Sequence, residues 1–209
     1  LIVRTDGSGD APEQRQTFKV ARRVLALAHV HLSLASELTT YAWIGEYAPV
    51  LSTLEVHPDL VTTVARAISR GPGLGIAHGR IGSGRRAVLA ACAGRRTLVV
   101  DGRAIASERG AAREQLRALH REARLLGCAP LIRNIDALGA SADTSDRCDL
   151  LEAEMPGLVL ATSTRAVRRR WGIPVTQIEL APLSGAACAR LWRTALPEAS
   201  ESDAELLAT

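Results

Sequence analysis

The sequence predicts a three-layer α/β domain with a five-stranded parallel sheet, preceded by a small helical appendage. From Gly71 onward, short apolar segments alternate with helical patterns, and this order favours parallel strands joined by helical crossovers. The length of 209 residues fits one domain with a short addition, and the 47% of hydrophobic residues can supply its core. Because only 3% of the residues are aromatic, we expect an aliphatic core.

Two helices are expected within residues 1–70, after a loose tail. The first begins at the capping-box pattern D-x-x-E at Asp10 and runs to about Leu38, with apolar residues such as Phe18 recurring near one face. The second covers Pro58–Arg70, where apolar residues have helical spacing and a glycine follows. We therefore expect this part of the chain to be a helical appendage.

Residues 71–200 are expected to form the α/β domain. The apolar runs predict strands, and the periodic segments between them predict helices. The predicted strands are Leu74–His78, Thr97–Val100, Pro130–Asp136, Leu158–Ser163 and Val175–Leu180. The predicted helices are Arg85–Ala93, Ser107–Leu126 and Ser184–Leu196.

A glycine-rich segment, GRIGSGRR, connects the first predicted strand to the helix after it. Its spacing, G-x-x-x-x-G, is that of a phosphate-binding loop. Glycines in such a loop let backbone N–H groups face a phosphate, and the following helix offers its positive N-terminal end. We expect the cofactor-binding residues to be Gly79, Gly82, Ser83, Gly84, Arg85 and Arg86.

Two arginines stand where a phosphate-binding loop carries a lysine and then a serine or threonine. Arg85 can contact phosphate, although its planar guanidinium is bulkier than an ammonium group. Arg86 lacks the hydroxyl that binds Mg²⁺, and its charge repels a cation. The sequence therefore argues against Mg²⁺ and leaves ATP or ADP as the candidate ligand.

The order of elements over roughly residues 55–200 resembles the AAA+ branch of the P-loop NTPases. The segment LIRNIDAL at Leu131–Leu138 is similar to the F-I-D-E-I-D-A-L of that family. Aligning I-D-A-L places Arg133 at the Mg²⁺-organising aspartate and Asn134 at the catalytic glutamate, whereas an alternative register makes Asp136 the metal-binding acid. We prefer the first register, because the second buries an arginine and an asparagine in mid-strand without partners. Both registers lack the glutamate.

Two further segments carry the resemblance. LVLATSTR, which ends at Arg165, is similar to the V-I-A-T-N-R strand and sensor of the family, and it places Ser163 or Thr164 at the sensor asparagine. IELAPLSGAACARLWRTAL, from Ile178, is similar to the end of the fifth strand and the helix after it. The resemblance implies that residues 201–209 are only the start of a helical lid. It also implies that the segment supplying an arginine finger to a neighbouring subunit contains Arg168, Arg169 and Arg170.

The positions on which an AAA+ motor depends are altered together. An asparagine cannot take a proton, and loss of a general base alone typically costs about 10²–10⁴-fold in rate. The resemblance therefore implies a degenerate, hydrolysis-deficient AAA+ module with an assembly or regulatory role in a larger, tandem or ring-forming ATPase. Its expected partners are further copies of itself or a neighbouring AAA+ module, with metal-independent binding of ATP or ADP. A slow but genuine ATPase, and a loop kept only as a structural turn, remain as alternatives.

The net charge of +4 suggests a different candidate function, which is nucleic-acid binding. The predicted helix Ser107–Leu126 carries an arginine every four residues, namely Arg109, Arg113, Arg117 and Arg121. Glu108, Glu114 and Glu122 lie near these arginines, and no aromatic residue is interleaved to stack bases. A solvated helix face is therefore favoured, and an arginine-rich nucleic-acid-binding module is kept as an alternative.

The cysteines and the hydropathy pattern indicate neither a metal site nor a membrane segment. The four cysteines form no C-x-x-C pair and have no histidine at metal-ligand spacing, so reduced structural thiols are expected. No apolar run approaches the roughly 20 residues that span a bilayer. We expect a cytoplasmic protein without membrane association.

Overall fold

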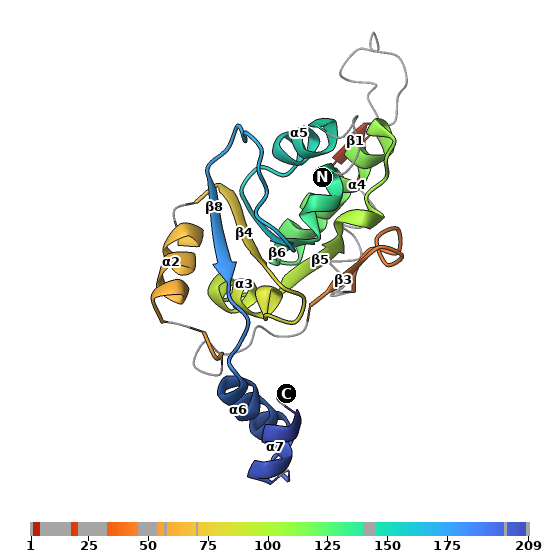
Figure 1. The fold of residues 1–209 in the computed structure, drawn as a ribbon. Helices are drawn as coiled ribbons and strands as arrows, with labels where there is room; N and C mark the ends of the chain where they lie inside the picture. Colours follow the sequence, from red (N-terminus) through yellow and green to blue (C-terminus); the bar gives the residue numbers. More distant parts are fainter. Residues whose placement is uncertain are drawn as a thin grey trace.

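A six-stranded sheet forms the middle layer of the computed structural model, which describes residues 2–4, 18–20, 33–45, 54–56, 58–69, 71–139, 145–198 and 200–207. The strand order is β3-β5-β6-β7-β4-β8. Figure 1 shows β8 beside β4 on one side of the sheet and β3 beside β5 on the other. The strands are β3 (Ala42–Ile44), β4 (Gly73–Gly79), β5 (Thr97–Asp101), β6 (Ala129–Arg133), β7 (Leu158–Ser163) and β8 (Val175–Leu180). The carboxyl ends of the five parallel strands meet at one edge, which is where open α/β sheets bind ligands.

The prediction of five parallel strands is correct for β4 to β8 and misses a sixth strand. β3 pairs antiparallel with β5, with Ala42 opposite Val100 and Ile44 opposite Leu98. Three residues are too few to show the alternation by which a strand is recognised from sequence. The mixed sheet therefore includes a stretch of chain that was expected to belong to the helical appendage.

Helices cover both faces of the sheet (Figure 1). α2 (Pro58–Ser69) and α3 (Arg85–Ala93) pack on one face through a cluster that includes Val64, Leu89 and Leu160. α4 (Arg109–Leu125) and α5 (Ser145–Glu154) pack on the other face through a cluster that includes the fully buried Leu116, Leu119 and Leu151. The three-layer prediction is confirmed, and the side chains in both clusters are mainly aliphatic, as the composition predicted.

The residues at the ends of α4 explain its limits. Glu108 caps its start, because the carboxylate accepts hydrogen bonds from the backbone N–H groups of Gly110 at 2.7 Å and Ala111 at 2.6 Å. These two bonds hold the pKa of Glu108 below its ordinary value. Gly127, in the left-handed region at φ 64°, ends the helix. The predicted helix over residues 107–126 is therefore present with slightly shorter bounds.

Within residues 1–70, the helix expected at Pro58–Arg70 is present as α2, whereas the predictions for the tail and the first helix are wrong where the structure describes them. A short β2 (Phe18–Val20) pairs antiparallel with β1 (Ile2–Arg4), so position 18 is in a strand rather than in the expected helix, and the expected loose tail contains a strand. Residues 36–41 form turns, in which the N–H of Tyr41 bonds to the carbonyl of Leu38. The rest of the expected first helix lies outside the described residues.

Two further elements differ from the prediction near the functional edge. β6 ends at Arg133 instead of Asp136, because Asn134 turns the chain at φ 52° and the short 3-10 helix η4 (Ile135–Gly139) follows. A second 3-10 helix, η3 (Gly102–Ala104), follows β5 in the same way. The carboxyl edge of the sheet is therefore built from tight turns.

The last two helices lie beyond the end of β8, apart from the sheet (Figure 1). α6 (Gly185–Ala195) and α7 (Glu201–Leu207) pack against each other, and the indole N–H of Trp192 donates to the carbonyl of Leu207 at 3.0 Å. An ion pair at 2.7 Å joins Arg190 of α6 to Glu55, which precedes α2. The predicted helix over residues 184–196 is present, and α7 occupies most of the segment that was compared with the start of a lid.

Candidate functional site

The glycine loop between β4 and α3 is held in a conformation that suits glycine. At Gly79 φ is 147°, and a Cβ would stand 2.4 Å from the carbonyl oxygen of Leu180 on the neighbouring β8. Gly82 and Gly84 also have positive φ, at 89° and 78°. L-residues with side chains rarely adopt such angles, which explains why glycine occupies these positions. The loop thus has the shape that its sequence predicted.

The N-terminus of α3 opens from this loop without a side-chain cap. Gly84 occupies the N-cap position, and no acidic residue lies in the first turn. The first N–H groups of a helix have no partner within the helix, and they carry a partial positive charge. Close by, the buried hydroxyl of Ser83 has no hydrogen-bond partner among the described residues. The loop therefore offers donors suited to an anion.

A cleft of about 510 Å³ lies in front of the loop and α3. Four of its described lining residues are arginines, from the loop, η3 and the end of β6, and none is a carboxylate. The remaining lining residues are small, hydroxyl-bearing or apolar, apart from one asparagine. The described lining consists of Ile81, Gly82, Gly84, Arg85, Arg86, Ala87, Arg103, Arg133, Asn134, Thr162 and Thr164. Four of the six predicted loop residues therefore lie in the cleft with Arg133 and Asn134. The other two, Gly79 and Ser83, do not line it.

Arg85 is partly buried and ties the loop to the neighbouring strand. Its guanidinium donates a hydrogen bond to the carbonyl oxygen of Ser163, the last residue of β7. Burial lowers the pKa of Arg85 from its ordinary value, the nearby Asp136 carboxylate opposes that shift, and Arg133 adds to it. Arg86, the next residue, is exposed. Only the second arginine is therefore fully available at the mouth of the cleft.

The two altered positions on β6 lie at the end of the strand rather than within it. Arg133 is exposed, and its guanidinium carbon lies 5.7 Å from the centre of the Trp43 ring. The side-chain amide of Asn134 donates to the Asp101 carboxylate at 2.9 Å. Asp101 also accepts from the backbone N–H of Arg103 at 3.0 Å. This carboxylate is therefore engaged in holding the two turns together.

The remaining candidate residues, in η4 and at the end of β7, lie close to the cleft. The hydroxyl of Thr164 donates to one oxygen of Asp136 at 3.3 Å, and the other oxygen is buried without a partner among the described residues. Ser163 is fully buried, and its hydroxyl accepts from the backbone N–H of Arg165 at 3.3 Å. Asp136 therefore interacts with one of the two sensor-like residues, Thr164, and it does not line the cleft at the loop.

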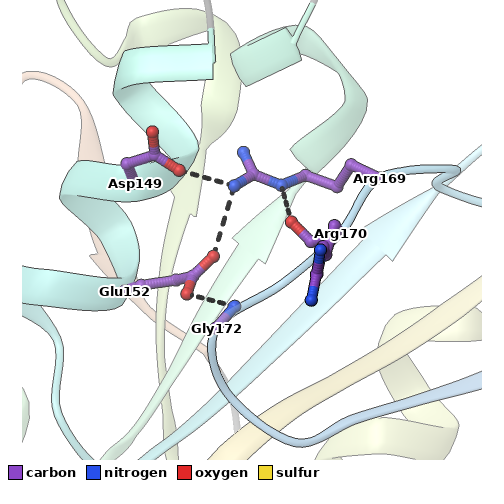
Figure 2. A network of polar contacts seen from close by, with 5 residues as sticks. All are labelled: Asp149, Glu152, Arg169, Arg170 and Gly172. Atoms are coloured by element: carbon purple, nitrogen blue, oxygen red, sulfur yellow. Dashed lines mark hydrogen bonds and ion pairs between the residues drawn. The ribbon is translucent and has the colours of Figure 1, made fainter.

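The three arginines at 168–170 lie in the loop between β7 and β8, and their environments differ. Figure 2 shows Arg169 reaching α5, where it pairs with Asp149 at 2.6 Å and Glu152 at 3.3 Å. Its guanidinium also lies 4.3 Å from the centre of the Trp171 ring. Because Glu152 accepts in addition from the backbone N–H of Gly172 at 2.7 Å, the loop is fixed to α5 at two places.

Arg168 and Arg170 are exposed, and no carboxylate contacts them among the described residues. They line a separate cavity of about 760 Å³, together with Asp136 and Arg165. Of the three arginines suggested as trans-acting, Arg169 is therefore engaged within its own chain. The other two remain accessible to a partner.

The arginine stripe on α4 is largely neutralised by carboxylates. Arg113 and Arg117 both pair with Glu154 of α5, at 3.0 and 2.6 Å, and Arg121 pairs with Glu37. These contacts favour the interpretation of a charged helix face over a nucleic-acid surface.

The described residues do not fit a magnesium ion at the loop. Mg²⁺ prefers an octahedron of oxygen ligands that includes carboxylates, whereas the described cleft lining offers four guanidinium groups. No group of three or more histidine, cysteine, aspartate or glutamate side chains within the described ranges could hold a metal ion. The four cysteines are free, and burial raises the pKa of Cys92, Cys128 and Cys148.

Three residues of this edge were missed by sequence reasoning. Arg103 and Thr162 line the cleft, and Trp43 contacts Arg133. Arg103 and Thr162 follow or end parallel strands whose carboxyl ends meet, so strand order was the signal that could have found them. Trp43 reaches the edge through β3, a strand of three residues that is too short to show an alternating pattern.

Comparison with known proteins supports the fold class. No family model matches the chain, and no curated protein matches it. Among the solved structures that match is one of katanin, an AAA+ ATPase, from work on the structural basis of katanin self-assembly. It aligns with a TM-score of 0.58 over 96% of this chain and 73% of the katanin chain, at 17% sequence identity. At this identity the likeness shows an AAA+-like fold and nothing further.

Among the described residues, no helix is long and apolar enough to cross a membrane.

Proposed function

We propose that this chain is a degenerate AAA+-like module that assembles with further copies or neighbouring AAA+ modules and binds nucleotide phosphates without a metal ion. The observation that carries the proposal is the composition of the cleft at the glycine loop. Four guanidinium groups line it, and no carboxylate does so among its described residues. Such a cleft is complementary to a polyphosphate, which carries several negative charges on oxygen acceptors.

The contrast with α4 strengthens this argument. On α4, Arg117 and Arg121 are paired with carboxylates, which satisfies their charge within the chain. In the cleft, the guanidinium groups of Arg86 and Arg103 have no carboxylate partner among the described residues, and that of Arg133 contacts an aromatic ring. Like charges gathered in one cleft repel one another, and an anionic ligand would relieve that repulsion.

The backbone of the loop supports the same ligand. The uncapped N-terminus of α3 and the unpartnered hydroxyl of Ser83 provide donors that a phosphate oxygen would satisfy. A phosphate on these donors would also lie beside Arg85 and Arg86, the first two residues of the helix. The two sets of donors are therefore complementary parts of one anion site.

Binding without hydrolysis is the form of the proposal that the residues support. Asn134 cannot accept a proton from water, and its amide is bonded to Asp101. Asp101, a nearby carboxylate, accepts from two donors of the protein itself. A slow ATPase remains the alternative, and it would need one of these groups to rearrange.

The assembly role rests on two supports. The katanin structure with the similar fold comes from work on katanin self-assembly. The resemblance to AAA+ proteins implies that the arginines of one subunit pack against the nucleotide site of the next. In this chain Arg168 and Arg170 are exposed. Arg169, between them, is fixed to Asp149 of α5, as Figure 2 shows. A fixed loop loses little conformational entropy when its exposed arginines bind a partner.

Isothermal titration calorimetry with ATP, in excess Mg²⁺ and in excess EDTA, tests the binding site. We expect heat of binding in both conditions with dissociation constants that agree within about threefold, since no carboxylate is present to hold the metal. The double variant Arg86→Ala/Arg103→Ala is expected to weaken binding at least about tenfold, because each charged hydrogen bond contributes roughly 1.5–3 kcal/mol. Arg95→Ala/Arg96→Ala, which removes two exposed arginines before β5, is the matched control.

Absence of heat in both conditions would overturn the binding proposal. Heat seen only with Mg²⁺ would contradict its metal-independent form. Phosphate release from ATP that is lost in Arg86→Ala/Arg103→Ala would favour the slow ATPase instead.

A further inference from the structure

Another cavity with cationic walls opens at the amino-terminal edge of the sheet, at the end of the strands opposite the glycine loop. Its volume is about 520 Å³, within the range that small-molecule sites occupy. It lies where α4 ends and where β6 and β7 begin. Neither the glycine loop nor the β7–β8 arginines contribute to its described lining.

Three nitrogen-bearing side chains line this cavity, and no carboxylate does so among its described residues. Arg95 precedes β5 and Arg124 is in the last turn of α4, and both are exposed. Their guanidinium groups have no carboxylate partner in the described part of the chain. Burial, and next the charge of Arg124, lower the pKa of His120, so its ring is mainly neutral at pH 7 and offers one N–H donor. The cavity therefore presents donors for an oxyanion.

The two arginines also act on their neighbours within the cavity. Cys128, another lining residue, is 4% exposed. Burial raises the pKa of its thiol, and the charges of Arg96 and Arg95 oppose that rise. Arg124 acts in the same way on His120. Each arginine of the cavity therefore lies close enough to another lining residue to affect its protonation.

Backbone hydrogen bonds hold the walls of the cavity in place. At the turn that ends α4, the N–H of Cys128 donates to the carbonyl of Ala123 at 2.8 Å. The N–H of Ala129, at the start of β6, donates to the carbonyl of Arg96 at 2.8 Å, which fixes the segment before β5. A cavity with fixed walls costs little conformational entropy when a ligand binds.

A smaller, apolar cavity of about 220 Å³ adjoins the first one at Leu158, which lines both. It lies at the same edge, where β4 and β8 begin, and no charged residue lines it among the described residues. Pro130 and Pro156 give the larger cavity an apolar wall as well. A ligand at this edge thus meets guanidinium groups at one end and apolar side chains at the other.

We propose that this edge of the sheet binds an organic carboxylate with a short apolar chain. The carboxylate contacts Arg95, Arg124 and His120, and the chain lies over Leu158 toward the smaller cavity. Guanidinium groups bind carboxylates through paired N–H donors, which fixes the head of such a ligand. Removal of the chain from water supplies the remaining affinity.

Isothermal titration calorimetry with octanoate tests the site, with acetate, butanoate and octan-1-ol as comparisons. Each buried methylene raises affinity by up to about fourfold, so butanoate and acetate are expected to bind at least about tenfold more weakly than octanoate. Octan-1-ol has the same chain without the charge, and it is also expected to bind at least about tenfold more weakly, because charged hydrogen bonds are lost. These comparisons use the wild-type chain and need no variant to fold.

The double variant Arg95→Ala/Arg124→Ala locates the head of the ligand. It is expected to weaken octanoate binding at least about tenfold. Arg168→Ala/Arg170→Ala, which removes two exposed arginines at the other end of the strands, is the matched control and is expected to bind octanoate as the wild type does. Circular dichroism of both variants checks that the sheet has formed.

Several outcomes would overturn the inference. Equal binding of octanoate and acetate would show that the chain contributes nothing, and equal binding of octanoate and octan-1-ol would show the same for the arginines. Equal weakening in the two double variants would assign the effect to net charge.

Titration of ATP into the octanoate-saturated chain separates this inference from the proposed function. We expect an unchanged dissociation constant for ATP, because the two sites lie at opposite ends of the strands. Competition would place octanoate at the glycine loop and overturn the inference. If ATP binds and octanoate does not, the inference fails and the proposed phosphate site stands.

Discussion

Gly79 is the residue at which the candidate site depends most directly on the absence of a side chain. It ends β4, pairs with Leu180 of β8, and has a φ of 147°. A Cβ at this position would stand 2.4 Å from the Leu180 carbonyl oxygen, a contact that real Cβ atoms essentially never make. The backbone of β4 or β8 would have to shift to admit it.

Gly79→Ala is therefore expected to lower the free energy of unfolding by about 1–3 kcal/mol more than a glycine substitution that meets no neighbour. Gly82→Ala is the matched control, since its φ of 89° imposes backbone strain and nothing lies within 4 Å of its Cβ. Urea unfolding followed by circular dichroism measures both. Equal losses in the two variants would show that the contact with Leu180 is relieved without cost.

Single residues of the site could be predicted from sequence where a local pattern specifies them. The loop glycines and Arg85 and Arg86 follow from the spacing of one continuous segment. Arg103 could not be found in this way, because its place in the cleft depends on which strands are neighbours. Asn134 was aligned with the family pattern, but its bond to Asp101 joins two strand ends that are 33 residues apart.

Among the elements, α4 and α5 are joined at their surface by ion pairs to one carboxylate, in addition to their buried contacts. Glu154, near the end of α5, accepts from Arg117 at 2.6 Å and pairs with Arg113 at 3.0 Å. The hydrogen bond from Arg117 is the main reason why the pKa of Glu154 is lower than in an unpaired glutamate. Because the folded state favours the ionised form, this carboxylate stabilises the protein at pH values above the ordinary pKa of glutamate.

The free energy of unfolding should consequently fall as the pH drops through the acid range, and protonation of Glu154 should cause part of that fall. Replacing it by glutamine removes the titration, so Glu154→Gln is expected to be less stable than the wild-type chain at pH 7 and to approach it near pH 3. Glu198→Gln, at an exposed residue with no ion pair among the described residues, is the control. Urea unfolding from pH 7 to pH 3 measures the difference, and a constant gap between variant and wild type would contradict the expectation.

Across the whole molecule, elements with a periodicity of their own could be predicted from the sequence, whereas elements defined by their pairing could not. The five parallel strands and the helices α3 and α4 were predictable, since each is a continuous segment with its own periodicity. β3 was not, because a three-residue strand is defined by its pairing with β5 and has too few residues for a pattern. The expected helix from Asp10 failed at Phe18–Val20, where pairing with β1 overrides the local capping pattern.

The proposed assembly concerns the molecule as a whole. In it, the exposed arginines of the β7–β8 loop would form contacts between subunits. Sedimentation velocity over a range of protein concentrations, with and without ATP, measures the association of the chain. Arg168→Ala/Arg170→Ala is expected to weaken it at least about tenfold, because arginines are among the residues that contribute most to interfaces. Arg169 is left intact, since its pairs with Asp149 and Glu152 hold the loop to α5.

Arg95→Ala/Arg96→Ala provides the control for charge alone. It removes the same two charges from exposed positions before β5, at the opposite end of the strands from the β7–β8 loop. If both double variants shift association equally, the effect is one of net charge and the loop has no special role. If neither shifts it, while ATP still binds, the assembly part of the proposal fails and the phosphate site remains. Loss of association confined to Arg168→Ala/Arg170→Ala would identify this loop as the surface through which one copy meets the next.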